Sequence, residues 1–227
     1  MSLFFNGLEQ FLLKALAVSI IAFFVIPVHE FAHSYMAYRL GDDTAKRMGR
    51  LTLAPLEHID IIGTLMMLLI GVGWGKPVPV NYDNFKRKKL YTALVALAGP
   101  LSNILAALLG GVIFNAVIVF VHNMNNDIFY MVQIFFQYYI MINLASAVFN
   151  MIPLPPLDGS KILMSFIPDR ILDSFFEKVY RYKFIIFILI FFFLSSSLLR
   201  VPMYMIQNWL FGWVMWLTSL PFRLVSF

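Results

Sequence analysis

The sequence predicts an all-α polytopic membrane protein with about four to six transmembrane helices and a re-entrant loop or β-hairpin element near residues 59–82. The first observation is composition: 61% of the 227 residues are hydrophobic and 13% are charged. Soluble domains are only about 45–50% apolar. The second is that the apolar residues form long runs separated by short basic segments, which is the arrangement typical of several membrane crossings. The mean hydropathy of +0.81 agrees with both.

Four runs are candidate spans, because about 20 apolar residues cross the bilayer core as a helix. They cover residues 11–40, residues 90–121 (which we expect to break at Gly99-Pro100), residues 128–151 and residues 184–199. Residues 201–221, which contain three tryptophans, form either a fifth span or a helix lying in the interface.

Residues 59–82 require a different structure. The apolar run 59–72 is too short to cross a core of about 30 Å comfortably. It leads into residues 71–81, where the density of Gly and Pro excludes a helix and alternating valines favour an extended strand or hairpin. We therefore expect an element that dips into the membrane and leaves on the same side, surrounded by protein or by a water-filled cavity.

Charge gives the orientation. Of the 17 Lys and Arg, 14 fall in the segments after the first span, before the second and after the third, and the loop 122–127 has none. Basic loops face the cytoplasm, so we expect a multi-pass protein of the cell membrane with its N-terminus outside. The net charge of +5 is explained by this orientation, and no nucleic-acid partner is expected.

Ionisable residues inside the first span mark a functional site. His29, Glu30 and His33 lie in an otherwise apolar stretch, where burial of such groups costs several kcal/mol. Positions i and i+4 share one face of a helix, so both imidazoles can bind one zinc ion while Glu30 reaches a water on the metal. The chain has no Cys, so a metal here must take His, Asp or Glu. The pattern predicts a zinc hydrolase site built within a membrane.

A hydrolytic zinc site usually has three protein ligands and a water. Asp158 is the best third candidate, because it begins a half-helix after a proline-rich break and is followed by Gly159. The alternative is that Asp158 only caps that helix, a common role for aspartate.

Several motifs together resemble the site-2 protease family, the intramembrane zinc metalloproteases of peptidase family M50, in its short bacterial form without PDZ or CBS domains. The motifs are His29-Glu30-x-x-His33, Arg39-Leu40-Gly41-Asp42, Gly49-Arg50-Leu51-Thr52-Leu53, His58-Ile59-Asp60, Gly73-Trp74-Gly75-Lys76-Pro77-Val78-Pro79-Val80-Asn81, Ala98-Gly99-Pro100-x-x-Asn103, and Asn150-x-x-Pro153-Leu154-Pro155-Pro156-Leu157-Asp158-Gly159. The resemblance covers residues 20–165. Ala54 and Ile61 depart from the family pattern, and neither belongs to the expected metal site.

The resemblance implies a zinc-dependent endopeptidase that cuts a membrane-protein substrate in or near a transmembrane segment. The charge pattern described above places the expected site toward the cytoplasmic side. The resemblance also implies one protease domain over residues 1–227, with a catalytic core at about 10–167 and C-terminal helices at about 170–227. The implied zinc ligands, one ion per chain, are His29, His33 and Asp158, with Glu30 as the general base. The implied substrate-binding residues are Asn103, Asn150, Lys76, Pro77, Val78, Pro79 and Val80, and the last five would pair with an unwound substrate.

The sequence also allows other roles for these residues. Each asparagine can equally form an interhelical hydrogen bond. For His58 we expect a hydrogen bond within its loop, in preference to a role as a further metal ligand. A protein that binds metal without proteolysis, such as a transporter or an inactive scaffold for a partner helix, is the second hypothesis, and the presence of Glu30 beside the ligands argues against it.

Overall fold

The computed structural model describes residues 2–70, 73–121, 127–168 and 197–223. Within these ranges the chain is helical and contains no assigned β-strand. Three helical stretches are long and apolar enough to cross a membrane: Phe11–Arg39, Lys88–Val119 and Phe129–Asn150. They correspond to the first three predicted spans and confirm the predicted fold class.

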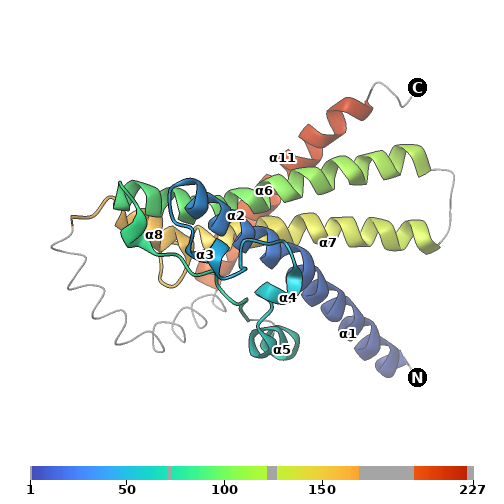
Figure 1. The fold of residues 1–227 in the computed structure, drawn as a ribbon. Helices are drawn as coiled ribbons and strands as arrows, with labels where there is room; N and C mark the ends of the chain where they lie inside the picture. Colours follow the sequence, from blue (N-terminus) through green and yellow to red (C-terminus); the bar gives the residue numbers. More distant parts are fainter. Residues whose placement is uncertain (1, 71–72, 122–126, 169–196, 224–227) are drawn as a thin grey trace.

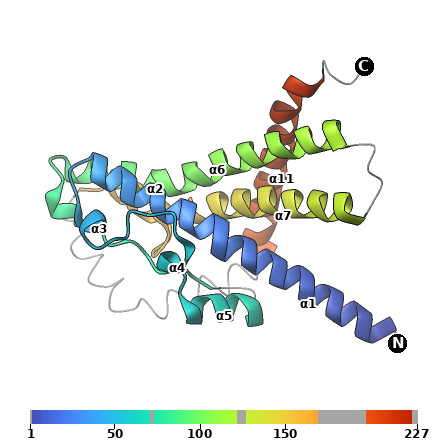
Figure 2. The same ribbon diagram turned by 45° about the vertical axis from the view of Figure 1, so that its right-hand side comes forward.

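The first span is one continuous helical rod. It consists of α1 (Ser2–Ile20), a five-residue π-helical turn η1 (Ile21–Val25) and α2 (Ile26–Arg39). Pro27, at the start of α2, has no N–H to donate, so the turn before it cannot keep the regular α-helical bonding. The wider π turn absorbs this defect within the rod. In Figure 2 the rod runs from α2, beside α6, to the N-terminus at the lower right, below α7.

The second and third spans form an antiparallel pair. Helix α6 (Lys88–Val121) and helix α7 (Asp127–Asn150) lie side by side in both views (Figures 1 and 2). The predicted break at Gly99-Pro100 is wrong, because α6 continues through Pro100. A proline removes one helical hydrogen bond, a loss that a membrane helix packed against its neighbours tolerates.

The segment between the first two spans is short and irregular. It contains α3 (Thr44–Arg47), α4 (Pro55–His58), α5 (Ile61–Ile70) and the 3₁₀ turn η2 (Tyr82–Asn84). Ten residues of α5 rise about 15 Å, half of a bilayer core, so α5 does not cross. The sequence predicts an extended strand or a hairpin here, and residues 73–81 have no assigned strand, so hairpin pairing is not found in this segment. Pro77 and Pro79 lack the N–H groups that a β-ladder needs. Re-entry of this element into the membrane stays a prediction.

Two further helices complete the described structure. Helix α8 (Asp158–Met164) follows the proline-rich turn after α7, as predicted. Helix α11 (Ser197–Ser219) crosses α6 and α7 (Figure 1) and is followed by a 3₁₀ turn, η3 (Leu220–Phe222). It is not among the three candidate spans, so the choice between a span and an interfacial helix stays open. Most of the predicted span 184–199 lies outside the described residues.

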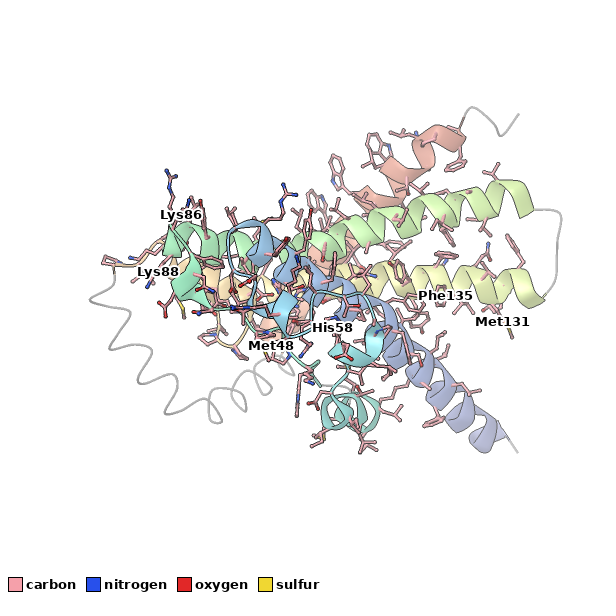
Figure 3. The ribbon with its side chains drawn as sticks, viewed as in Figure 1. Met48, His58, Lys86, Lys88, Met131 and Phe135 are labelled. Atoms are coloured by element: carbon pink, nitrogen blue, oxygen red, sulfur yellow. The ribbon has the colours of Figure 1, made fainter. Side chains whose placement is uncertain are left out.

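The larger of two buried core clusters sits where α6, α7 and α11 meet. It is built around Ala107 and Phe114 of α6, Ile140 and Leu144 of α7, and Val214 of α11. Small residues allow the close approach: a Cβ on Gly110 would lie 2.7 Å from Tyr139 of α7. This packing holds the helices of the bundle together. Lys86 and Lys88 lie at the same end of the bundle as α8, whereas Met131 lies at the other end of α7 (Figure 3).

Candidate metal centre and active site

Three side chains from two helices converge on one point. His29 and His33 of α2 and Asp158 of α8 offer ligand atoms that all lie within 4.8 Å of one another. The two imidazole Nε2 atoms are 3.0 Å apart, and each is 3.0 Å from Asp158 Oδ2. All three residues are at least 93% buried, with exposed fractions of 7%, 6% and 5%.

Helix geometry and a turn bring these side chains together. One helical turn separates His29 from His33, which places both rings on the face of α2 that meets α6. Asp158 reaches them because the chain after α7 turns back tightly: a Cβ on Gly159 would lie only 2.3 Å from the carbonyl oxygen of Met151. Glycine is therefore required for α8 to start beside this turn.

Helix α6 forms the wall behind both rings. A Cβ on Gly99 would lie 2.5 Å from Cε1 and Nε2 of His33 and 2.6 Å from Cε1 of His29. The missing side chain at Gly99 is thus the space that the imidazoles occupy. The sequence identifies Gly99 only as part of a family motif, whereas the structure shows its packing role.

The donor set fits zinc. Ligand atoms about 2.0–2.1 Å from a tetrahedral zinc lie about 3.3 Å apart, and the three pairwise separations here are 3.0 Å. Two imidazoles and one carboxylate are an ordinary ligand set for zinc. The other carboxylate oxygen, Asp158 Oδ1, accepts a hydrogen bond from Lys161 Nζ at 3.1 Å, so Oδ2 is left for the cluster.

The outer nitrogens of both rings are also bonded. His33 Nδ1 lies 2.7 Å from the backbone oxygen of Val95, to which it donates. His29 Nδ1 lies 3.1 Å from the amide of Asn103, which is fully buried and in turn lies 2.8 Å from Ser146 Oγ. Such partners orient a metal-binding imidazole and set its tautomer.

Glu30 is half-buried beside the cluster and faces the segment 76–80. Its Oε2 accepts a hydrogen bond from the backbone N–H of Val78 at 2.9 Å, the only hydrogen bond of this carboxylate among the described residues. Lys76 anchors the start of the segment: its N–H donates to the His58 carbonyl (2.8 Å), and its own carbonyl accepts from Arg50 Nη2 (2.7 Å).

Asp42 anchors the far end of the same segment. Its carboxylate, fully buried after the end of α2, accepts hydrogen bonds from the backbone N–H of Asn81 (2.8 Å) and the amide of Asn84 (2.7 Å). Burial alone would raise the pKa of Asp42, but the hydrogen bonds from Thr44, Asn81 and Asn84 outweigh it and hold the pKa below its usual range. The segment is therefore fixed at both ends and at Val78.

The structure brings together most, but not all, of the predicted site residues. His29, Glu30, His33, Asp158 and the segment 76–80 lie in one neighbourhood, and Asn103 touches His29. Asn150 does not join the cluster; its Nδ2 donates to the Ser146 carbonyl of its own helix at 3.1 Å. His58 is fully buried, lies outside the metal cluster and donates from Nε2 to the Thr52 carbonyl at 2.8 Å, which confirms its loop hydrogen bond.

Four contributors were not singled out from sequence. Two of them could have been found only from their spacing along a helix. Ser146 lies four residues before Asn150, and Lys161 lies three residues after Asp158. Val95 contributes a backbone oxygen, which no sequence pattern reveals. Arg50 lay in a noted motif, but its bond to the Lys76 carbonyl depends on how the loop folds.

Membrane-spanning helices around a buried His-His-Asp cluster, with a glutamate beside it, define a membrane metallohydrolase. The chain belongs to peptidase family M50: the model described as Peptidase family M50 matches residues 17–192. The protein is therefore a zinc metalloprotease by family, and an integral membrane protein by its three apolar helices.

Two relatives illustrate the similarity. The chain is 39% identical over 182 residues to a Bacillus subtilis (strain 168) protein named Putative zinc metalloprotease YwhC, covering 79% of this chain and 81% of that one. It is 27% identical over 197 residues to Putative zinc metalloprotease Rip2 of Mycobacterium tuberculosis, covering 85% of this chain and 69% of that one. No solved structure matches the chain.

Proposed function

We propose that the protein is an intramembrane endopeptidase with one zinc ion per chain, which hydrolyses a peptide bond in or near a transmembrane segment of a membrane-protein substrate. The observation that carries the proposal is the convergence of His29, His33 and Asp158, buried among membrane helices, with Glu30 beside them. His29 Nε2, His33 Nε2 and Asp158 Oδ2 would hold the ion. Bound zinc lowers the pKa of a coordinated water to about 7 and polarises a carbonyl.

Glu30 would act as general base and then as general acid. One carboxylate oxygen accepts the Val78 N–H, which orients the group and leaves the second oxygen to take a proton. In the hydrolysis, Glu30 takes a proton from the attacking water and gives it to the nitrogen of the scissile amide as the C–N bond breaks. The products are a carboxylic acid and an amine, and Glu30 returns to its ionised form.

The segment 76–80 would guide the substrate. In an extended chain, successive N–H groups point to opposite sides. On the inner edge, the N–H of Lys76 donates to His58 of α4 and the N–H of Val78 donates to Glu30 of α2. On the outer edge, positions 77 and 79 are prolines, which have no N–H. The outer edge therefore offers carbonyl oxygens alone, so we expect an unwound substrate to pair by donating its own N–H groups.

The orientation of the site supports cleavage near the cytoplasmic face. Lys86 and Lys88 lie at the same end of the structure as α8 (Figures 1 and 3), and the neighbouring Lys89 donates from Nζ to the Ile167 carbonyl just after α8 (2.8 Å). Basic residues favour the cytoplasm, so we propose that this end faces it, in the cell membrane, with the N-terminus outside. Water needed for hydrolysis would enter from the same side, because hydrocarbon excludes it.

The test is cleavage of a single-span model substrate in liposomes by wild type and Glu30→Gln, with the zinc content of both measured. A matched control is Glu57→Gln, which removes an exposed carboxylate on α4 away from the cluster. We expect wild type and the control to cut, Glu30→Gln to lose cutting, and all three to hold about one zinc per chain. If Glu30→Gln cuts like wild type, the assigned base is wrong. If all three bind zinc and none cuts any of a panel of spans, the non-proteolytic metal protein is the better description.

A further inference from the structure

Asn103 has a hydrogen-bonding conflict at the metal cluster. Its amide nitrogen Nδ2 lies 3.1 Å from His29 Nδ1 and 2.8 Å from Ser146 Oγ. Its amide oxygen Oδ1 is buried and has no hydrogen-bond partner. With a fully buried side chain, no contact with bulk water relieves this arrangement.

The chemistry of His29 decides the direction of the bond. A neutral imidazole carries one proton, and the nitrogen that binds a metal must be the one without it. Because His29 Nε2 points to the cluster, its proton belongs on Nδ1, which then needs an acceptor. An amide N–H group placed there is a donor facing a donor.

Reversing the amide removes the conflict. The oxygen and nitrogen of an asparagine amide are interchangeable by a half-turn of the group, and the choice follows from the hydrogen-bond network. With Oδ1 toward His29, it accepts from both Nδ1–H and the Ser146 hydroxyl, which can donate as well as accept. Either orientation leaves one amide atom without a partner among the described residues, so the proton on His29 decides between them.

The neighbouring groups agree with this direction. Asn150 Nδ2 lies 3.4 Å from Ser146 Oγ, so Ser146 can accept from Asn150 while its own proton goes to Asn103. The second imidazole provides an internal precedent, because His33 Nδ1 donates to a carbonyl oxygen, that of Val95. Both rings would then have a carbonyl oxygen at Nδ1, one from the backbone and one from a side chain.

We propose that Asn103 is a positioning residue for the metal site, whose amide carbonyl accepts the Nδ1 proton of His29 and is itself held by Ser146. This inference rests on the proposed zinc site. It gives Asn103, expected from sequence to face the substrate, a place behind the metal ligand. Outer partners of this kind change metal affinity by about 10–100-fold when they are removed.

Zinc affinity of the purified full chain in detergent, measured by competition with a chelating dye, tests the proposal without relying on cleavage. Asn103→Ala removes the acceptor, and we expect zinc to bind about 10–100-fold more weakly. Asn103→Asp keeps an acceptor and has no donor, so we expect affinity within about three-fold of wild type, since carboxylates serve this role for zinc-bound histidines. The matched control is Asn115→Ala on the same helix, which removes an amide bond to Thr218 of α11 (3.0 Å) away from the cluster.

The outcomes separate the possibilities. Equal weakening in Asn103→Ala and Asn103→Asp would mean that the amide donates to His29, and would overturn the proposal. If zinc binds equally weakly to Asn103→Ala and Asn115→Ala, the loss of affinity reflects general packing of α6, and the proposal is overturned as well. Wild-type affinity in Asn103→Ala would also refute it. Absence of zinc binding by wild type itself would instead be a failure of the proposed metal site.

Discussion

Replacing Gly99 with alanine should prevent tight zinc binding, because the added methyl group would overlap both imidazoles. Its Cβ would lie 2.5 Å from His33 Nε2, whereas ordinary contacts begin at 3.4 Å. The ring would have to retreat by the difference between these two distances, about 0.9 Å.

The rings cannot yield without leaving the cluster. His33 is tied to the Val95 oxygen at 2.7 Å, and Val95 lies on the same helix as Gly99. A shift of that size is several times the tolerance of about 0.2 Å on metal–ligand distances. Removal of an outer partner alone costs about 10–100-fold in affinity, so displacement of a ligand should cost at least about 100-fold.

The assay is zinc affinity by chelator competition, compared with Gly110→Ala. That control adds a methyl group to the same helix, 2.7 Å from Cδ1 of Tyr139, so it strains the packing of α6 on α7 away from the metal cluster. We expect Gly110→Ala to lower the melting temperature and to keep wild-type zinc affinity. Wild-type affinity in Gly99→Ala, or an equal loss in Gly110→Ala, would refute the reasoning.

Three other predictions concern pH, metal and charge. Because the folded pKa of Asp42 is lowered, its stabilisation is fully present above the unfolded value of about 3.9 and is lost as pH falls from there through the lower folded value. The melting temperature of Asp42→Asn should therefore lie below that of wild type at pH 6, and the gap should begin to narrow below about pH 4. Removal of zinc should lower stability by about 2.7 kcal/mol relative to protein with free zinc at 100 times its Kd, measured by thermal unfolding with and without chelator. Lys14 Nζ bonds the Leu69 carbonyl at 3.0 Å near the end of α5, so Lys14→Met should speed amide exchange in α5. A cation at a helix C-terminus contributes about 0.3–1 kcal/mol, which corresponds to about two- to five-fold in exchange rate.

Each of these has a contradicting result. A gap between wild type and Asp42→Asn that is constant from pH 6 to pH 3 would mean that the charge of Asp42 does not stabilise the fold. A melting temperature that is the same with and without chelator would mean that no metal binds the folded state preferentially. Exchange in α5 that is unchanged in Lys14→Met, or that changes equally in α7, would remove the assigned role of Lys14.

Local spacing was enough to predict part of the site. The separation of His29 from His33 fixes a common helical face, so two candidate ligands follow from the sequence with no knowledge of the fold. Asp158 could be named because a proline-rich break and Gly159 indicated a new helix start. The three long apolar runs were predicted for the same reason, since length and hydropathy are local properties.

Other features depend on partners that are distant in the sequence. Gly99 shows its role only when α6 packs against α2, and Asn103 only when the proton on His29 is considered. Alternating valines predict an extended strand or a hairpin, but hairpin pairing also depends on free N–H groups: Pro77 and Pro79 have none, and Glu30 accepts the N–H of Val78. The continuity of α6 through Pro100 likewise reflects packing by neighbouring helices, which outweighs the local preference of proline.

The separation of the cluster along the chain has a consequence for biosynthesis. His29 and Asp158 are 129 residues apart. At about 5–20 residues per second, the ribosome makes Asp158 roughly 6–26 s after His29. During that interval the growing chain holds the two imidazoles without the Asp158 carboxylate. The proposed centre needs all three groups, so it stays inert until the third span and the turn after it have been made. Under the proposed function, a chain whose synthesis has not yet passed Asp158 cannot cleave other newly made helices at the same insertion site.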